Sequence, residues 1–271
     1  MRIEKIGDAT LYCGDCFDIL PTLQTTVDAV ITDPPYGCTC ADWDTPIDLA
    51  LFWEKILPCT KENTAICVFS QMPFTVDLVV SQKKLFRYDL VYQKQKATGF
   101  LNANKMPLRD HELILVFYRK LPTYNPQKFY KGTSSLRKTQ RARWSTIYGK
   151  RLYESGMGSN DGSRYPRSVI HAPMEEDFFK YPGYDKHPTQ KAVSVMLWLT
   201  KTYVNEGNIV LDPFMGSGTT GVAALKCGRK FIGIEKKEEY FDTACFRLEK
   251  ALKEIEKERD MPKQLWLGDA V

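Results

Sequence analysis

Short apolar runs alternate with amphipathic stretches along the first 120 residues. Compact runs rich in β-branched residues predict strands at Thr10 to Cys13, Val27 to Thr32 and Ala65 to Phe69. Apolar positions at helical spacing predict helices at Phe17 to Leu23, Leu49 to Leu57 and Pro73 to Ser81. Two further runs, Tyr88 to Gln93 and Glu112 to Tyr118, predict an antiparallel pair at a sheet edge.

The alternation returns after a stretch without periodicity. From Leu121 to Tyr184, polar, Pro and Gly residues dominate and no apolar stripe persists. Beyond it, the pattern predicts helices at Lys191 to about Tyr203 and Thr219 to Lys226, and strands at Ile209 to Leu211 and Phe231 to Ile234. A last amphipathic helix carries Phe241, Ala244, Cys245, Leu248, Leu252 and Ile255. We therefore expect an α/β, doubly wound, Rossmann-like sheet, formed by residues 1–120 and 185–271, with a loop-rich insert at 121–184.

Composition places the chain among ordinary globular proteins. Its 271 residues are 43% hydrophobic and 26% charged, which suffices for one sizeable core. No apolar run approaches the ~18 to 20 residues of a membrane-spanning helix, and the N-terminal residues do not resemble a secretory signal. Cysteines spread through the expected core favour a reducing compartment, so we expect a cytoplasmic protein.

Two cysteine pairs raise the alternative of a zinc site. Cys13-x-x-Cys16 and Cys38-x-Cys40 offer four thiolates, but the second spacing is short for a tetrahedral site. We expect most cysteines to be small buried side chains and we expect no metal.

The net charge of +5 is concentrated in the insert. Leu121 to His171 carries a net charge of +8, which leaves −3 for the rest of the chain. A basic segment on a slightly acidic body is typical of proteins that contact phosphates, and a merely solvated loop is the alternative. The residues expected to bind DNA are Lys128, Arg137, Lys138, Arg141, Arg143, Trp144 and Arg151.

A glycine-rich turn follows the strand that ends at Leu211. Gly216-x-Gly218-x-x-Gly221 matches a nucleotide-binding fingerprint, and Glu235 ends the next strand, where a carboxylate would bind ribose hydroxyls. Asp212, just before the turn, would repel a pyrophosphate and attract an ammonium group, so S-adenosylmethionine suits the turn better than NAD. Thr219 and Thr220 offer hydroxyls and N–H groups to the carboxylate of that cofactor.

A second site follows the strand that ends at Thr32. Asp33-Pro34-Pro35-Tyr36 lies at the carboxyl end of a buried strand, where α/β sheets bind their ligands. The prolines make the Asp33 carboxylate and the Pro34 carbonyl a rigid pair of acceptors. Such a pair suits the exocyclic –NH2 of a base, held beside a methyl donor, while Tyr36 stacks on a flipped-out base.

Together, Asp33-Pro34-Pro35-Tyr36 and the segment from Asp212 to Thr220 resemble the amino-group DNA methyltransferases. The order of the motifs is the circularly permuted β arrangement, in which the catalytic motif precedes the cofactor motif. The resemblance implies a seven-stranded sheet whose last strand is antiparallel, an insert that recognises the target sequence, double-stranded DNA as partner and a bacterial or phage source. It leaves open a homodimer and a cognate restriction endonuclease.

The resemblance also assigns residues. Gly14-Asp15-Cys16 matches the motif that contacts the cofactor adenine, His187-Pro188-Thr189-Gln190-Lys191 a further cofactor motif, and Glu235 the ribose-binding acid. The catalytic residues are Asp33, Pro34, Pro35 and Tyr36. The expected cofactor contacts are Asp15, Cys16, Asp33, Thr189, Lys191, Asp212, Pro213, Phe214, Gly216, Ser217, Gly218, Thr219, Thr220 and Glu235.

Two positions depart from the family pattern. Ala192 stands where a proline is common, and Tyr92-Gln93-Lys94 where Trp-x-Lys is frequent, which leaves the role of Lys94 open. An aspartate before Pro-Pro-Tyr is typical of the adenine enzymes, so we expect methylation of adenine. The alternatives are the cytosine amine, RNA, a catalytically idle DNA-binding protein and a nicotinamide-dependent oxidoreductase.

Overall fold

A computed structural model describes residues 1–37, 44–130, 143–144, 152–153, 162–171 and 190–260. The chain divides into two compact units, Met1–Tyr124 with Val169–Val271, and Asn125–Ser168. The smaller unit lies within the predicted insert of residues 121–184. In the described part of the chain, no helix is long and apolar enough to cross a membrane.

The larger unit contains a nine-stranded sheet, counted over the described residues, in the order β1-β2-β13-β12-β3-β4-β6-β5-β11. These strands are β1 (Arg2–Ile6), β2 (Ala9–Cys13), β3 (Val27–Thr32), β4 (Thr60–Ser70), β5 (Phe86–Thr98), β6 (Arg109–Phe117), β11 (Val169–His171), β12 (Ile209–Asp212) and β13 (Lys230–Glu235). From β2 to β4 every neighbouring pair is parallel, and β6 is antiparallel to both β4 and β5. The predicted doubly wound, Rossmann-like α/β sheet is confirmed. The expectation of seven strands with one antiparallel strand is wrong for the described residues, because β1 and β11 add one strand at each edge and β1 is antiparallel to β2.

The predicted β5–β6 pair is not the edge of the sheet. Strand β11 pairs in parallel with β5, with Ile170 opposite Tyr92, so the antiparallel pair is covered on its outer side. Ile170 is buried between two exposed neighbours. Three residues are too few for their alternation to stand out in a segment that otherwise lacks periodicity, and the sequence analysis therefore assigned β11 to the insert.

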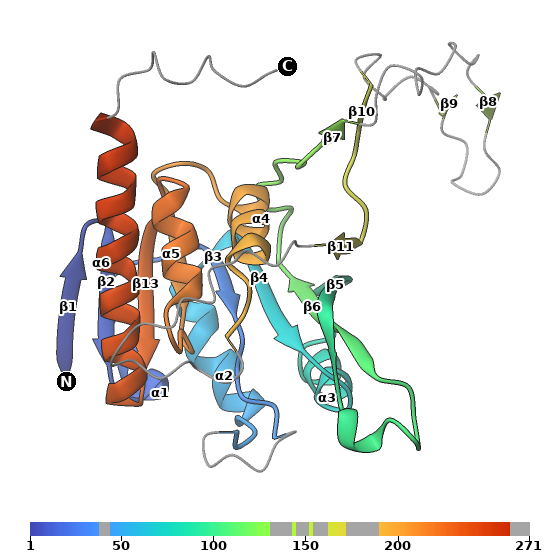
Figure 1. The fold of residues 1–271 in the computed structure, drawn as a ribbon, viewed down its shortest axis with the longest axis horizontal. Helices are drawn as coiled ribbons and strands as arrows, with labels where there is room; N and C mark the ends of the chain where they lie inside the picture. Colours follow the sequence, from blue (N-terminus) through green and yellow to red (C-terminus); the bar gives the residue numbers. More distant parts are fainter. Residues whose placement is uncertain (38–43, 131–142, 145–151, 154–161, 172–189, 261–271) are drawn as a thin grey trace. The chain divides into compact units, whose positions relative to one another are not determined.

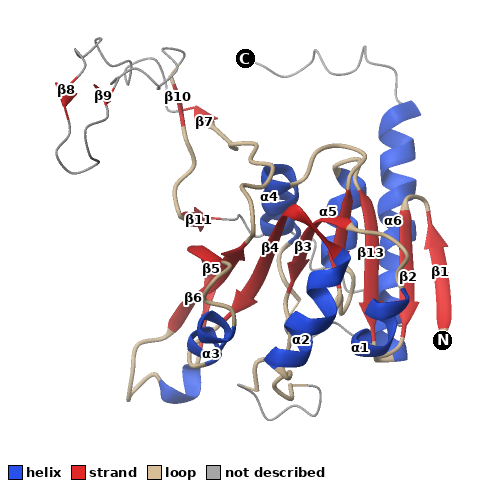
Figure 2. Ribbon diagram, turned by 180° about the vertical axis from the view of Figure 1, so that it is seen from behind, coloured by secondary structure: helices blue, strands red, loops and turns tan. Residues whose placement is uncertain are grey.

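Helices cover both faces of the sheet. Those of the larger unit are α1 (Cys16–Ile19), α2 (Leu49–Ile56), α3 (Phe74–Ser81), α4 (Val193–Tyr203), α5 (Thr219–Lys226) and α6 (Glu238–Asp260), with 3-10 turns at Leu20–Thr22, Leu57–Cys59 and Phe100–Asn102. Figure 1 shows α4, α5 and α6 in front of the sheet, and Figure 2, from the opposite side, shows α1, α2 and α3 in front. A separate hydrophobic cluster lies on each face. The core therefore has the three layers expected of an α/β fold.

Parallel pairing brings the two predicted motifs to the same edge of the sheet. Leu211 of β12 pairs with Val30 of β3 in parallel, so Asp212, the last residue of β12, and Asp33, the residue after β3, lie at the same end of neighbouring strands. The change in strand order at β3 and β12 opens a crevice at their carboxyl ends, which is the usual ligand position in this architecture.

The smaller unit has little regular structure in its described residues. β7 (Phe129–Tyr130) pairs with β10 (Ser163–Arg164), and β8 (Arg143–Trp144) pairs with β9 (Leu152–Tyr153), both antiparallel.

Candidate active site

A pocket of about 580 Å³ opens at the carboxyl ends of the central strands. The predicted site residues that line it are Asp15, Cys16, Asp33, Pro34, Pro35, Tyr36, Lys191, Asp212, Pro213, Phe214, Gly216, Ser217, Thr219, Thr220 and Glu235. The structure thus brings together residues from both motifs. Thr189 lies outside the described residues. No group of His, Cys, Asp and Glu that could hold a metal ion occurs within the described ranges, and these ranges omit Cys38 and Cys40.

Gly218 was predicted to contact the cofactor but does not line the pocket. It is the N-cap of α5, with φ +77°. A Cβ at this position would lie 2.9 Å from both Ala244 Cβ and Leu248 Cδ1 of α6. The glycine therefore serves the close approach of the turn to α6, and its contact with a cofactor stays a prediction.

The hydroxyls of Thr219 and Thr220 are also engaged within the protein. Thr220 Oγ1 donates to Asp212 Oδ2 at 2.6 Å, and Thr219 Oγ1 accepts from Arg247 at 3.0 Å. The Thr220 hydroxyl therefore donates within the protein in this structure, and the contact of these two residues with a cofactor carboxylate stays a prediction. The helix N-terminus of α5 still directs backbone N–H groups toward the pocket.

Arg247, on α6, supports the glycine-rich turn and was missed by the sequence analysis. Its guanidinium is buried and donates to Ser217 O at 2.6 Å and to Ser217 Oγ at 2.8 Å. One signal was available, because Arg247 lies within the apolar stripe of α6, between Ala244 and Ala251. A charged residue at such a position needs a buried partner.

Asp212 is the most enclosed carboxylate of the site. Its Oδ1 accepts from Thr32 Oγ1 at 2.7 Å and from Phe214 N–H at 3.1 Å, and its Oδ2 accepts from Thr220. Burial raises the pKa of Asp212 to about 7, although these three hydrogen bonds favour the charged form. The carboxylate therefore fixes the turn after β12 as well as lining the pocket.

Two further carboxylates, Glu235 and Asp15, line the pocket. Glu235 Oε2 accepts from Gly216 N–H at 3.0 Å and Oε1 from Lys237 N–H at 2.7 Å. Burial raises the pKa of Glu235 against these bonds. Asp15 caps α1 by accepting from Phe17 N–H at 2.9 Å, and it pairs with Lys236 at 3.0 Å. Both carboxylates line the pocket and so can present acceptor oxygens to a ligand hydroxyl or amine.

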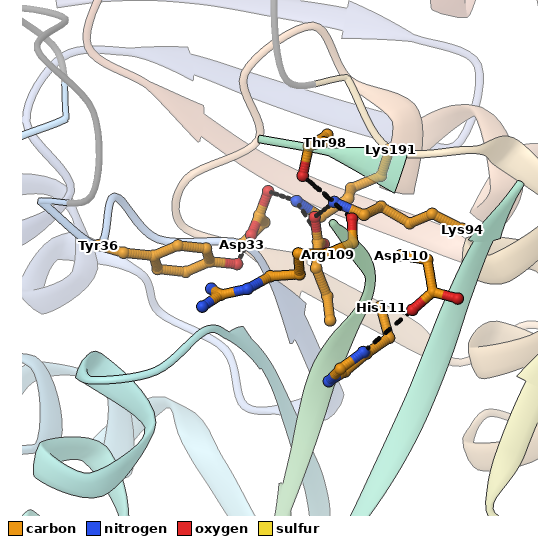
Figure 3. Close-up of polar contacts among 9 residues, drawn as sticks. Asp33, Tyr36, Lys94, Thr98, Arg109, Asp110, His111 and Lys191 are labelled. Carbon is orange, nitrogen blue, oxygen red and sulfur yellow. Dashed lines mark hydrogen bonds and ion pairs between the residues drawn. The ribbon is translucent and has the colours of Figure 1, made fainter. Parts of the chain in front are cut away.

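The Asp33 side chain is held from two sides, as Figure 3 shows. The Tyr36 hydroxyl donates to Asp33 Oδ1, and Lys191 Nζ lies 2.5 Å from Asp33 Oδ2. The Tyr36 ring packs against Phe74, with centroids 5.3 Å apart and an interplanar angle of 30°. Tyr36 is therefore fixed before any base is bound.

Asp44 was not predicted, yet it shapes the loop after Asp33. Its Oδ1 accepts from the N–H groups of Tyr36 and Gly37, both at 2.8 Å. Nothing in the sequence around Asp44 marks it, because its two partners lie seven and eight residues earlier in the chain.

Glu112 and Lys94 extend the site behind Lys191. Lys191 Nζ lies 3.1 Å from Glu112 Oε2, and Lys94 Nζ lies 3.2 Å from Glu112 Oε1. Burial opposes these charges, but the opposite charges outweigh it, lowering the pKa of Glu112 and raising that of Lys191. Glu112 was missed because it sits inside a strand of the predicted hairpin, far from either motif in sequence.

The predicted DNA-binding residues belong to the smaller unit. Arg137, Lys138, Arg141 and Arg151 lie outside the described residues, and of Arg143 and Trp144 the structure describes only the backbone pairing in β8. The Lys128 ammonium lies 4.8 Å from the centroid of the Tyr165 ring.

Comparison with known proteins gives one family match. The model of the DNA methylase family matches residues 27–246. DNA adenine methyltransferase YhdJ of Escherichia coli K12 is 48% identical over 264 residues, which cover 89% of this chain and 83% of that protein. Type II methyltransferase M1.MboII of Moraxella bovis is 28% identical, over 86% of this chain and 94% of that protein.

Solved structures show the same similarity. A crystal structure of the M1.HpyAVI-SAM complex has a TM-score of 0.59 and 26% identity, and covers 89% of this chain and 98% of that chain. The cytosine-N4-specific PvuII DNA methyltransferase has a TM-score of 0.62 at 15% identity, over 93% of this chain and 94% of that chain, and supports the fold alone.

Proposed function

Because this chain belongs to the DNA methylase family, we propose that it transfers a methyl group from S-adenosylmethionine to the exocyclic amine of adenine in double-stranded DNA. The observation that carries this proposal is the shared pocket. Asp33 and Tyr36, which suit a base amine, and Asp212, Glu235 and the glycine-rich turn, which suit a cofactor, line one cavity.

The pocket residues fit S-adenosylmethionine. A cavity of about 580 Å³ is of the size that holds a cofactor. Phe17 and Phe214, whose ring centroids lie 6.4 Å apart, offer apolar surface to an adenine ring. Glu235 would accept from ribose hydroxyls and Asp15 from polar groups at the adenosine end. Asp212, which lines the pocket, would attract an ammonium group.

The main contribution of the protein to methyl transfer would be to position the target amine beside the methyl donor. When bound, S-adenosylmethionine supplies a methyl group on a positively charged sulfur. Asp33 and the Pro34 carbonyl would each accept one N–H of the amine, so that the nitrogen lone pair points at the methyl carbon. S-adenosylmethionine would supply the methyl carbon to the nitrogen held by Asp33 and Pro34, and its sulfur would keep the electron pair of the broken carbon–sulfur bond.

Asp33 then acts a second time. The methylated nitrogen carries a positive charge and one proton too many, and a carboxylate beside it stabilises this charge. Burial and the nearby Glu112 raise the pKa of Asp33, while Lys191 opposes the rise. Asp33 is thereby suited to accept the excess proton and pass it to water.

Two observations favour adenine over cytosine. An aspartate opens the Pro-Pro-Tyr motif, and the relative that is 48% identical carries the name DNA adenine methyltransferase. Cytosine remains the second candidate, because both bases offer a conjugated amine and a face for Tyr36.

The partners follow from the same proposal. The basic insert, including Lys128, would contact DNA phosphates and read the target sequence, and the target base would leave the duplex to reach Asp33. A homodimer and a cognate restriction endonuclease stay predictions from the family resemblance.

The test is direct. Purified protein is incubated with S-adenosylmethionine and unmethylated bacterial genomic DNA, and the hydrolysed nucleosides are resolved by mass spectrometry. We expect 6-methyladenine as the main modified base, and long-read sequencing of the same DNA reports its sequence context. Dominant 4-methylcytosine would correct the target base, whereas no methylated base would overturn the proposal.

A further inference from the structure

A buried run of alternating charges lies behind Asp33, and the proposed transfer does not by itself require it. We propose that Glu112 is a positioning residue, which acts through Lys191 to hold the Asp33 carboxylate toward the target amine. The inference rests on the proposed function, because it deepens the role of Asp33 in methyl transfer.

The contacts form an unbroken chain, drawn in Figure 3. From the reacting carboxylate outward, the order is Asp33, Lys191, Glu112 and Lys94, with separations of 2.5, 3.1 and 3.2 Å. Lys94 ends the chain beside Thr98 Oγ1, at 3.5 Å. The signs alternate along the chain, so each charge has an opposite neighbour.

Four separate segments contribute one residue each. Asp33 follows β3, Lys94 lies on β5, Glu112 on β6, and Lys191 precedes α4. Ala192, the N-cap of α4, has extended backbone (φ −68°, ψ 139°), so the helix begins after Lys191 and not at it. The chain of charges therefore arises from tertiary structure and not from neighbouring positions on one element.

The Lys191 side chain is buried and closely packed, which limits the groups that its ammonium can contact. Its side chain is 9% exposed, and its Nζ lies 5.3 Å from the Phe69 ring centroid and 6.0 Å from that of Tyr36. The sequence predicted a cofactor contact for Lys191, but these contacts direct its ammonium group to Asp33. Glu112, 12% exposed, is the second anion that fixes the ammonium there.

A contribution to folding stability is a weak explanation for these buried ion pairs. Desolvation offsets most of the attraction within a buried ion pair, and apolar residues of similar volume are often as stabilising. Strongly coupled buried charges that reach into a cleft are instead typical of functional sites. Lys191 and Glu112 both line the pocket that contains Asp33.

The arrangement predicts the sign of each electrostatic change. The groups that face Asp33 are Tyr36 from its own loop, Lys191 before α4, Glu112 on β6 and Asp212 at the end of β12. Lys94 lies one contact further away on Glu112, and Arg109, beside Gln71, extends toward Tyr36 in Figure 3. Removing the Glu112 charge favours ionised Asp33, whereas removing the Lys191 charge disfavours it.

The experiment compares variants of the whole protein in steady-state methylation across pH. Glu112→Gln keeps the shape of the side chain but releases Lys191, and we expect kcat to fall by about 10- to 100-fold. The acidic limb of kcat/KM should move to lower pH, while the Kd for S-adenosylmethionine stays within a few-fold. Lys191→Met should lower kcat and move the same limb to higher pH, and Lys191→Arg should return it toward the wild-type position.

The control is Glu62→Gln, which removes an exposed ion pair with Lys120 and should leave rate and pH profile unchanged. A structural role alone would lower stability without moving the acidic limb in opposite directions. An unchanged limb and unchanged kcat in Glu112→Gln, with circular dichroism of the wild-type form, would overturn the inference. Failure of the proposed function is distinguishable, because then the wild-type protein itself methylates no DNA.

Discussion

The hydroxyl of Thr32 donates a hydrogen bond of 2.7 Å to Asp212 Oδ1, across a sequence separation of 180 residues. Both side chains are buried, and they join the ends of the adjacent parallel strands β3 and β12. The catalytic motif follows the first strand and the glycine-rich turn follows the second. The bond thus fixes the two halves of the site relative to each other.

Replacing Thr32 by Val tests this bond. The shape is kept, but Asp212 Oδ1 retains only the Phe214 N–H as a donor, so we expect a loss of about 1–3 kcal/mol in the free energy of unfolding. Urea denaturation measures it. Thr26→Val, at an exposed position just before β3, is the control and should change stability little. Equal stability of the two variants would show that the bond contributes nothing net.

Asp33→Asn removes the charge beside the target amine. We expect methyl transfer to fall below detection. The Asn side chain has one acceptor oxygen in place of two and no negative charge to stabilise the cationic product. The Kd for S-adenosylmethionine, measured by calorimetry, should stay within a few-fold. Asp89→Asn, an exposed carboxylate on β5, should retain full activity. Substantial turnover in Asp33→Asn would contradict the assigned role.

The raised pKa of Asp212 predicts how stability depends on pH. Its pKa rises from 3.8 to about 7, so between these values the folded protein holds a proton that the unfolded chain releases. The contribution of this group to stability is therefore present below about pH 4 and is lost as the pH rises toward 7. Asp212→Asn should lose less stability than wild type over this interval in urea titrations. If the free energy of unfolding of wild type and Asp212→Asn changed in parallel with pH, the raised pKa of Asp212 would be contradicted. The control is Asp77→Asn, which removes an exposed carboxylate on α3 and should follow the wild-type curve.

Comparing Gly218→Ala with Gly207→Ala separates the effect of steric crowding from that of backbone strain. The Cβ added at Gly218 would meet Ala244 and Leu248 at 2.9 Å, at φ +77°, whereas Gly207 has φ +75° and nothing within 4 Å. We expect Gly207→Ala to cost about 1–2 kcal/mol from strain alone, and Gly218→Ala about 1–3 kcal/mol more. Thermal unfolding measures both. The Gly218 variant should also weaken S-adenosylmethionine binding, since the turn must shift away from α6.

Salt dependence tests the basic insert. If Lys138 and Arg141 contact phosphates, alanine at each position should reduce the log–log slope of DNA affinity against salt by about 0.9. Fluorescence anisotropy over a salt series gives the slopes. Lys253→Ala, on the exposed face of α6, serves as control. Unchanged slopes in the insert variants would place the DNA-binding surface elsewhere.

The sequence predicted the parts of the site that are local in the chain. One motif is a buried strand followed by Asp33-Pro34-Pro35-Tyr36, and the other is a strand followed by glycines. Each can be recognised within about a dozen consecutive residues. Since both strands are parallel and central, their ends had to meet in one crevice.

The missed residues act across the fold. Glu112 reaches the site because β6 lies beside β4, and Arg247 because α6 packs against the glycine-rich turn. Asp44 reaches it through bonds to Tyr36 and Gly37, seven or eight residues away in sequence. Only Arg247 leaves a signal in the sequence, as a charged residue within the apolar stripe of α6. Strands β1 and β11 were not predicted for a different reason. Short edge strands bury too few side chains to produce a periodic hydrophobic pattern.

The order of strands also bears on how the protein is made. Strands β12 and β13 lie between β2 and β3, although β12 begins 177 residues after the end of β3 and β13 begins 217 residues after the end of β2. When the first 120 residues have left the ribosome, β2 and β3 each expose an unpaired edge to whatever is nearby. The central sheet can close only after residues 209–235 have emerged, so the nascent chain must be protected from pairing with other chains until synthesis is almost complete.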